Sequence, residues 1–138
     1  MRGLGAVILV GVLMLQGCVI VAVGVVAAAA AGVTYTLTGV AEKTFNEPFD
    51  SVGDALQKAL ISLDIKTGNP RNIEKGGRVV KTEIEAFTRD TTIKIDIERV
   101  GDTATKVTVD ASRNYLMRDK DTATQILNQT TDNLSKKS

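Results

Sequence analysis

The chain has 138 residues, no histidine, one cysteine and a formal net charge of +1. A single cysteine excludes an internal disulfide, and the lack of histidine excludes Ser-His, Cys-His and His-rich metal sites. Arg2 is the only charged residue before Glu42, so the 17 Lys and Arg residues less Arg2 balance the 16 Asp and Glu residues. Everything after the apolar N-terminal segment is therefore formally neutral, which gives no electrostatic case for binding nucleic acid.

Residues 1–17 are predicted to be an export signal. A short basic region at Met1-Arg2 precedes an apolar stretch from Ala6 to Leu15, as in secretory signals. This stretch is shorter than the about 20 apolar residues that a helix needs to span a bilayer. The signal is therefore expected to be removed.

The cut site Leu15-Gln16-Gly17-Cys18 resembles the lipobox of bacterial lipoproteins. The match is good at Leu15, Gly17 and Cys18, whereas Gln16 stands where Ala, Ser or Thr is usual. In such proteins the cysteine thiol is alkylated by a diacylglyceryl group. A signal peptidase then cuts before the cysteine, and the new amino group is acylated with a fatty acid such as palmitate. The resemblance implies cleavage between Gly17 and Cys18 and lipid attachment at Cys18.

The main alternative is an uncleaved membrane helix, because the segment from Gly3 to Val33 is long enough to cross a bilayer. Its second half is weakly hydrophobic, with alanines at 27–31, whereas a dedicated anchor favours Leu, Ile and Phe. Lipid anchoring in the cell envelope is therefore the favoured interpretation. Val19 after the cysteine, by analogy with enteric bacteria, favours the outer membrane facing the periplasm.

Residues 18–33 hold the lipidated cysteine and an Ala/Gly-rich apolar run. Gly24, Ala28 and Gly32 recur at every fourth position and would share one helical face, which favours self-association or contact with a protein partner. The other interpretation is a flexible or partly helical tether. We favour the tether, because such spacing is common in any Ala/Gly-rich run.

Residues 34–138 are predicted to form one periplasmic α+β domain. Thr34 to Phe45 reads as a first strand with a bulge at Gly39. Asn46 is expected to cap the next helix, with Pro48 in its first turn. The inner face of this helix is expected to consist of apolar residues at three- and four-residue steps: Phe49, Val52, Leu56, Ala59, Leu60 and Leu63.

A short strand is expected at Ile65 to Thr67, followed by a break at Gly68-Asn69-Pro70 and a turn at Lys75-Gly76-Gly77. Three alternating strands come next. Their inner faces would hold Val80, Thr82, Ile84 and Ala86; Ile93, Ile95 and Ile97; and Val107, Val109 and Ala111.

The register of these strands follows from their connections. A two-residue connection at Arg89-Asp90 and a three-residue loop at Gly101-Asp102-Thr103 align the apolar faces of all three strands. The same register places opposite charges across the polar face, apart from the like-charged Glu83 and Asp96. The expected pairs are Ala86 with Ile93, Ile84 with Ile95, Thr82 with Ile97, Ile97 with Val107, Ile95 with Val109, Glu85 with Lys94, Lys81 with Glu98, Glu98 with Lys106 and Lys94 with Asp110.

After a linker at residues 112–117, a second helix is predicted from Asp119 to Leu134, with Ala123, Ile126, Leu127, Thr130 and Leu134 inward. The predicted fold is a two-layer α+β sandwich. An antiparallel sheet of about four to five strands carries two helices on one face, in the order β-α-β-β-β-β-α.

A family resemblance spans nearly all of the chain after residue 17. Cys18, the Ala/Gly run and the segment TYTLTGVAEKTFNEPFDSVGDALQKALISLDI with its following alternating strands are similar to small bacterial lipoproteins of domain-of-unknown-function family 3568. The resemblance implies lipidation and this fold, and it supplies no reaction, ligand or catalytic residue.

Glu83 and Asp96 are the carboxylates that could share a proton, but Lys-paired neighbours make a solvated charge lattice the favoured interpretation. Tyr115, Leu116 and Met117 lie between arginines and suit either a partner contact or core packing beneath the second helix. Core packing is the favoured interpretation of the two.

We expect a non-catalytic envelope lipoprotein without metal or cofactor, acting by protein contact. The alternative is a small-ligand binder with a pocket between helices and sheet.

Overall fold

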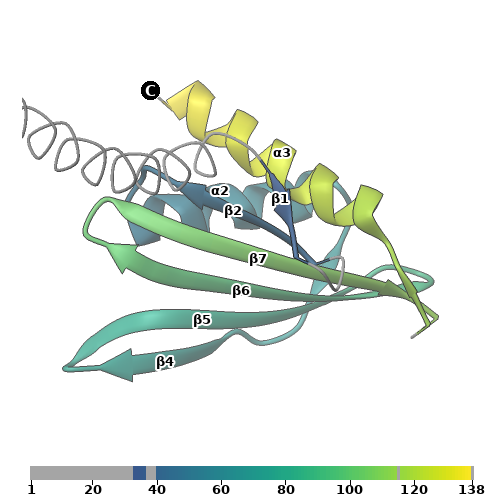
Figure 1. Cartoon of the computed structure of the whole chain (residues 1–138), viewed down its shortest axis with the longest axis horizontal. Coiled ribbons are helices and arrows are strands. Elements are labelled where there is room, and N and C mark those ends of the chain that lie inside the picture. The colour runs from purple at the N-terminus through teal and green to yellow at the C-terminus, as the bar shows by residue number, and fades with distance from the viewer. Residues whose placement is uncertain (1–32, 37–39, 115, 138) are drawn as a thin grey trace, which may run out of the picture.

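The computed structural model describes residues 33–36, 40–114 and 116–137. Within these residues, two helices lie on one face of an eight-stranded antiparallel sheet (Figure 1). The predicted α+β class is confirmed, and the predicted strand count is too low. In chain order the elements are β1 (Thr34–Tyr35), β2 (Ala41–Phe45), α2 (Phe49–Ser62), β3 (Lys66–Thr67), β4 (Arg71–Lys75), β5 (Arg78–Phe87), β6 (Thr91–Gly101), β7 (Ala104–Arg113), β8 (Met117–Arg118) and α3 (Lys120–Lys137).

The strands lie side by side in the order β1-β2-β7-β6-β5-β3, with β4 also paired to β5 and β8 to β7. Neither helix in the described part of the chain is long and apolar enough to cross a bilayer. Several predictions concern residues outside the described ranges: the signal at 1–17, Cys18, the small residues Gly24, Ala28 and Gly32, the bulge at Gly39, and Tyr115.

The single first strand predicted for Thr34 to Phe45 is wrong, because the chain reverses within it. β1 pairs antiparallel with β2 and forms one edge of the sheet. The Thr36 N–H donates to the Val40 carbonyl at 2.9 Å, and the Val40 N–H donates to the Thr36 hydroxyl at 3.2 Å. Only β2 reaches β7, and it carries Ala41 and Phe45 into the core.

Helix α2 begins later than predicted, and Asn46 does not cap it. Pro48 is the N-cap residue, with an extended backbone at φ −60° and ψ 151°. Its carbonyl accepts the first helical hydrogen bond from Val52 at 3.1 Å. Because helical geometry starts only at Phe49, Asn46 lies too far upstream to reach the free N–H groups. The predicted inner face is otherwise confirmed, except that Leu63 is only half-buried.

The predicted register of β5, β6 and β7 is confirmed at every pair. The β6–β7 connection differs from the prediction, because Gly101 pairs with Ala104 and a bulge follows Arg99. The bulge places the extra residue at Val100, which is 49% exposed. It shortens the connection to two residues and leaves the alignment of the buried side chains unchanged.

Strands β4 and β8 were not predicted. β4 pairs with β5 through a turn at Gly76 and Gly77, whose φ angles of 62° and 74° favour glycine. Every residue of β4 is exposed, and its register shifts between Ile73 and Glu74. β8 begins at Met117, the last residue of the predicted linker, where the chain pairs back onto the end of β7.

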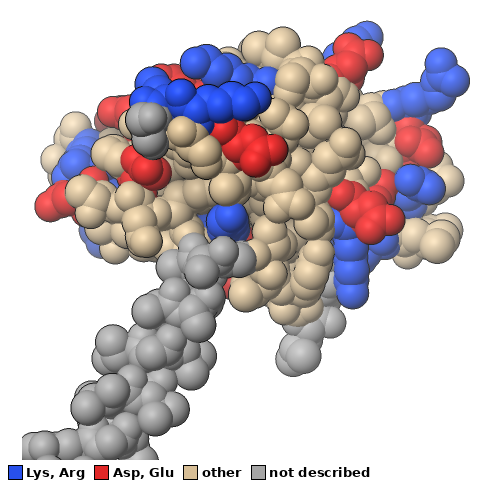
Figure 2. Space-filling view, turned by 90° about the horizontal axis from the view of Figure 1, so that it is seen from above, with Lys and Arg blue, Asp and Glu red and all other residues tan. Residues whose placement is uncertain are grey.

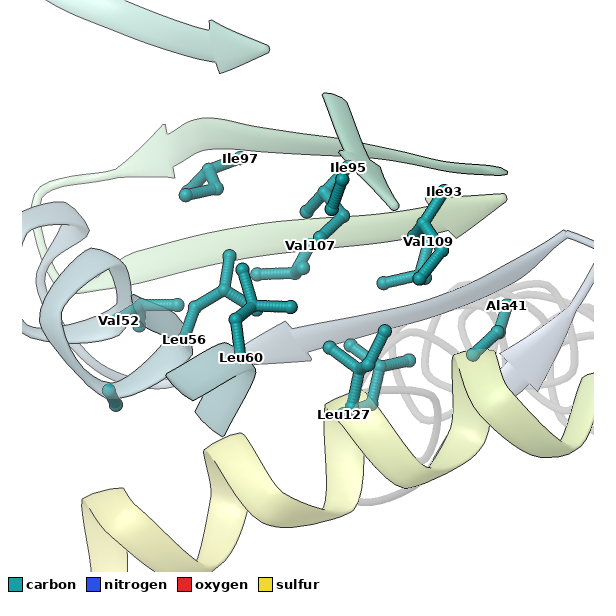
Figure 3. Close-up of a cluster of buried hydrophobic side chains, with 14 of the residues drawn as sticks. Ala41, Val52, Leu56, Leu60, Ile93, Ile95, Ile97, Val107, Val109 and Leu127 are labelled. Atoms are coloured by element: carbon teal, nitrogen blue, oxygen red, sulfur yellow. The ribbon is translucent and has the colours of Figure 1, made fainter. Parts of the chain in front are cut away.

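The hydrophobic core fills the space between the helices and the inner face of β2, β7 and β6 (Figure 3). Leu56 and Leu60 point from α2 toward Val107, and Leu127 points in from α3. Ile93, Ile95 and Ile97 line β6 at alternate positions and are at most 3% exposed. The alternation predicted from the sequence is therefore the alternation that builds the core.

Asp119 caps helix α3, which runs three residues beyond the predicted end at Leu134. The Thr122 N–H donates to Asp119 Oδ1 at 3.0 Å and the Thr122 hydroxyl to Oδ2 at 2.8 Å. Arg113 donates to Oδ2 at 3.0 Å. Burial acts to raise the pKa of Asp119, but the hydrogen bonds from Thr122 and Arg113 outweigh it and hold this pKa below its ordinary value of 3.8.

We expect Asp119→Ala to lower the free energy of unfolding by about 1 kcal/mol at pH 7, because α3 loses its cap. A lowered folded-state pKa stabilises the fold above the unfolded pKa, and this stabilisation is lost as pH falls through the folded value. The cost of Asp119→Ala should therefore shrink between pH 7 and pH 3, as measured by urea denaturation. Asp119→Asn keeps an acceptor and should cost less. An equal cost of the alanine variant at both pH values would contradict this role of the carboxylate.

Candidate functional site

The like-charged pair predicted on the open face of the sheet has a cation between its members. Lys81 Nζ lies 3.2 Å from Glu83 Oε1 and 3.3 Å from Asp96 Oδ2. Its hydrogen bonds to Glu83 and, to a smaller extent, to Asp96 raise the pKa of Lys81. Lys81 lies opposite Glu98 in the register as predicted, but its amine binds these two carboxylates. The arrangement agrees with a solvent-facing charge lattice.

The open face also carries a broad depression of about 590 Å³ whose walls hold side chains of both signs, among them Arg71, Lys94 and Asp110. Among the residues that the structure describes, no three carboxylate or thiol side chains are grouped to hold a metal ion. On the helical side, Lys, Arg, Asp and Glu side chains are likewise interspersed, with uncharged areas between them (Figure 2).

The segment that joins β7 to β8, here called the loop and taken to include Met117 at the start of β8, presents apolar side chains to solvent. Leu116 is 91% exposed and Met117 is 69% exposed. The favoured prediction that these side chains pack beneath the second helix is therefore wrong for both residues. Because β8 pairs back onto β7 before α3 begins, the chain carries them past the end of the core.

Ion pairs hold both ends of this loop. Arg113 Nε lies 3.5 Å from Asp90 Oδ2, and Arg113 also binds Asp119. Arg118 binds Asp110 on the neighbouring strand. The arginines at the two ends therefore have protein partners, and among the described residues of the loop Leu116 and Met117 are the exposed apolar side chains.

A groove runs along the other margin of the helix layer. α3 packs over β2 and β7, and α2 packs over β6 and β7, so β5 lies at the margin of the helices. Ile84 on the inner face of β5 is only half-buried as a result. The groove has a volume of about 400 Å³, within the usual range for ligand sites. Its floor is Thr82, Ile84 and Ile97, and its walls include Phe49, Gly53, Gln57 and Leu60 on α2 and Thr67, Gly68, Pro70 and Asn72 beside β3 and β4.

The comparison with known families gives one result. The family model described as "Protein of unknown function (DUF3568)" matches residues 4–133. The chain belongs to this family. No curated protein gives a significant match to the chain. The match confirms the resemblance to domain-of-unknown-function family 3568, and it covers both the apolar N-terminal segment and the folded domain.

In this DUF3568 member, the residues of one candidate site were predicted from the sequence, whereas for the other only a pocket between helices and sheet was predicted, without its residues. Leu116 and Met117 were candidate contact residues, and the structure brings them together on one exposed loop. The groove was not predicted in this position, because β4, which forms part of its wall, was not predicted. Asp50 and Asp54 also line the groove on the α2 side. They were the available sequence signal for it, since residues four positions apart lie on one side of a helix.

Proposed function

We propose that this DUF3568 protein is a non-catalytic lipoprotein of the cell envelope, held by acyl chains on Cys18 and acting by contact with another protein. The lipobox-like sequence before Cys18 supports the anchor, and the family match begins at residue 4 and so includes it. An outer-membrane location facing the periplasm agrees with Val19. The observation that carries the contact role is the exposure of Leu116 and Met117 on a loop fixed by ion pairs.

Exposed apolar groups on a fixed loop suit a binding surface, because little ordering is needed when a partner covers them. The double substitution Leu116→Ser and Met117→Ser should change the free energy of unfolding by less than about 0.5 kcal/mol. It should also abolish crosslinks to a partner formed in intact cells from a photoreactive residue at position 121, which lines the same hollow as Met117 and does not hold the loop. Mass spectrometry of the crosslinked product would identify the partner.

Ile61 supplies the matched control for this experiment, because it is a large apolar side chain that is 74% exposed on another element, α2. Ile61→Ser should leave crosslinking from position 121 unchanged. Unfolding of the double loop variant would show that these side chains are structural. Unchanged crosslinking in a folded double variant would also refute the contact role of the loop.

A second candidate function, small-ligand binding, is supported by the groove between α2 and β5. Its floor includes the apolar side chains Ile84 and Ile97, and α2 contributes Phe49 and Leu60 to its wall. Largely apolar concave sites with a few polar groups are typical of ligand sites. This function is tested by measuring whether a substitution that fills the groove prevents a small probe from binding.

A further inference from the structure

We propose that the groove between α2 and β5 binds an elongated cationic amphiphile, with its apolar chain on Ile84 and Ile97 and its cationic group beside Asp50 and Asp54. This inference rests on the second candidate function and names the chemical class of its ligand. Three features of the groove support it: its shape and floor, its charge, and a glycine in its helical wall.

The shape and floor suit an unbranched apolar chain. The groove follows α2 from Phe49 to Leu60, about 17 Å at 1.5 Å per residue. Below it, the inner face of β5 holds Ile84, which the helices leave half-buried. Thr82 contributes no free donor here, because its hydroxyl donates to Asn72 Oδ1 at 2.8 Å. An apolar chain along the floor would bury Ile84 and displace water from it.

The charged side chains that line the groove are of one sign, and the Arg99 guanidinium lies outside this lining, 4.7 Å from the centroid of the Phe49 ring. Asp50 and Asp54 lie on its helical wall, and no Lys or Arg is among its lining residues in the described part of the chain. Neither carboxylate forms an ion pair with another described residue. Asp50 is in the first turn of α2, where the helix dipole already favours a carboxylate, whereas Asp54 lies one turn further along. A ligand cation between them would offset part of this negative charge.

Gly53 keeps the groove open between these two carboxylates. It lies within α2, where glycine disfavours the helix relative to alanine. A Cβ added at this position would meet no atom within 4 Å, so no close packing requires glycine here. A larger side chain at position 53 would project into the space that the proposed ligand fills.

The test uses the full-length protein in vesicles of zwitterionic lipid and octylammonium as the probe, followed by saturation-transfer NMR with protein-free vesicles as the blank. Octanesulfonate has the same chain and the opposite charge. We expect octylammonium to bind about tenfold more tightly, since the groove attracts one ion and repels the other. Asp50→Asn with Asp54→Asn should weaken octylammonium binding about fivefold and abolish the preference.

Three further variants separate the groove from the rest of the surface. Gly53→Leu should abolish binding of octylammonium, and Gly53→Ala should weaken it less while raising the midpoint of thermal unfolding. Asp121→Asn removes an acidic group from the first turn of α3, outside the groove, and should leave the binding of octylammonium unchanged. Thermal unfolding of each variant verifies that it is folded.

The outcomes distinguish the two hypotheses. Equal, Gly53→Leu-sensitive binding of both probes would overturn the cationic amphiphile and leave small-ligand binding in place. Absence of any Gly53→Leu-sensitive binding would overturn both. A third probe, a short peptide of alternating Leu and Lys, tests whether the groove instead binds a segment of another protein. If it binds more tightly than octylammonium, the groove holds a protein segment and the proposal is wrong.

Discussion

Cys18→Ser should yield a protein with no acyl mass that still carries residues 1–17. The thiol is the group that is alkylated, and in lipoproteins cleavage follows that modification. Each methylene buried in a bilayer contributes about 0.8 kcal/mol, so loss of two or three acyl chains removes the whole lipid anchor. Intact-mass measurement of membrane-extracted protein detects both changes, and fractionation of the two membranes should show that the variant does not reach the outer membrane.

Gln16→Ala supplies the control for this experiment, because it moves the cut site closer to the usual lipobox pattern. It should be acylated and cleaved at least as completely as the unmodified protein. If the unmodified protein retained residues 1–17 and carried no acyl mass on Cys18, the lipoprotein proposal would fail. The uncleaved membrane helix would then be the correct interpretation.

Leu56→Ala is expected to give the largest loss of stability, about 3 kcal/mol of the free energy of unfolding. Leu56 is fully buried, and it points from α2 toward the inner face of the sheet (Figure 3). Its truncation removes apolar burial and leaves a cavity that the surrounding strands cannot close. The free energy of unfolding of a native protein is only about 5 to 15 kcal/mol. Urea denaturation should therefore show a large decrease of the midpoint concentration.

Ile61→Ala is the matched variant on the same helix, because Ile61 is 74% exposed. It should change the free energy of unfolding by less than about 0.5 kcal/mol. A similar loss in both variants would mean that helix propensity, rather than packing of the inner face, determines the stability of α2. A loss below about 1 kcal/mol for Leu56→Ala would contradict its place in the core.

The central strands could be predicted because two independent patterns select one register. Ile93, Ile95 and Ile97 alternate with charged residues, and a slip of one residue would expose all three. β4 escaped prediction because both of its faces are exposed, so burial imposes no alternation on it. The reversal between β1 and β2 escaped because Thr34 to Phe45 consists largely of residues that favour strands on either side of the turn.

The candidate sites depend on packing that the sequence does not encode locally. Whether Leu116 and Met117 are buried depends on whether the core has room for them, and Ile93 and Ala111 already fill it at this end. The groove exists because two helices are narrower than the sheet they cover. Asp50 and Asp54 form a polar helix face that can be found in the sequence. This face becomes a wall of the groove only because β5 and the chain around β3 and β4 lie opposite it.

Under the proposed membrane anchoring, the irregular strand β4 has a further consequence for domains held side by side. An exposed edge strand can pair with the edge of a neighbouring molecule and start aggregation. Here Arg71, Glu74 and Lys75 place charges along the edge, and the register shift after Ile73 interrupts its hydrogen-bonding pattern. These features should keep neighbouring domains from joining their sheets, even at high local concentration.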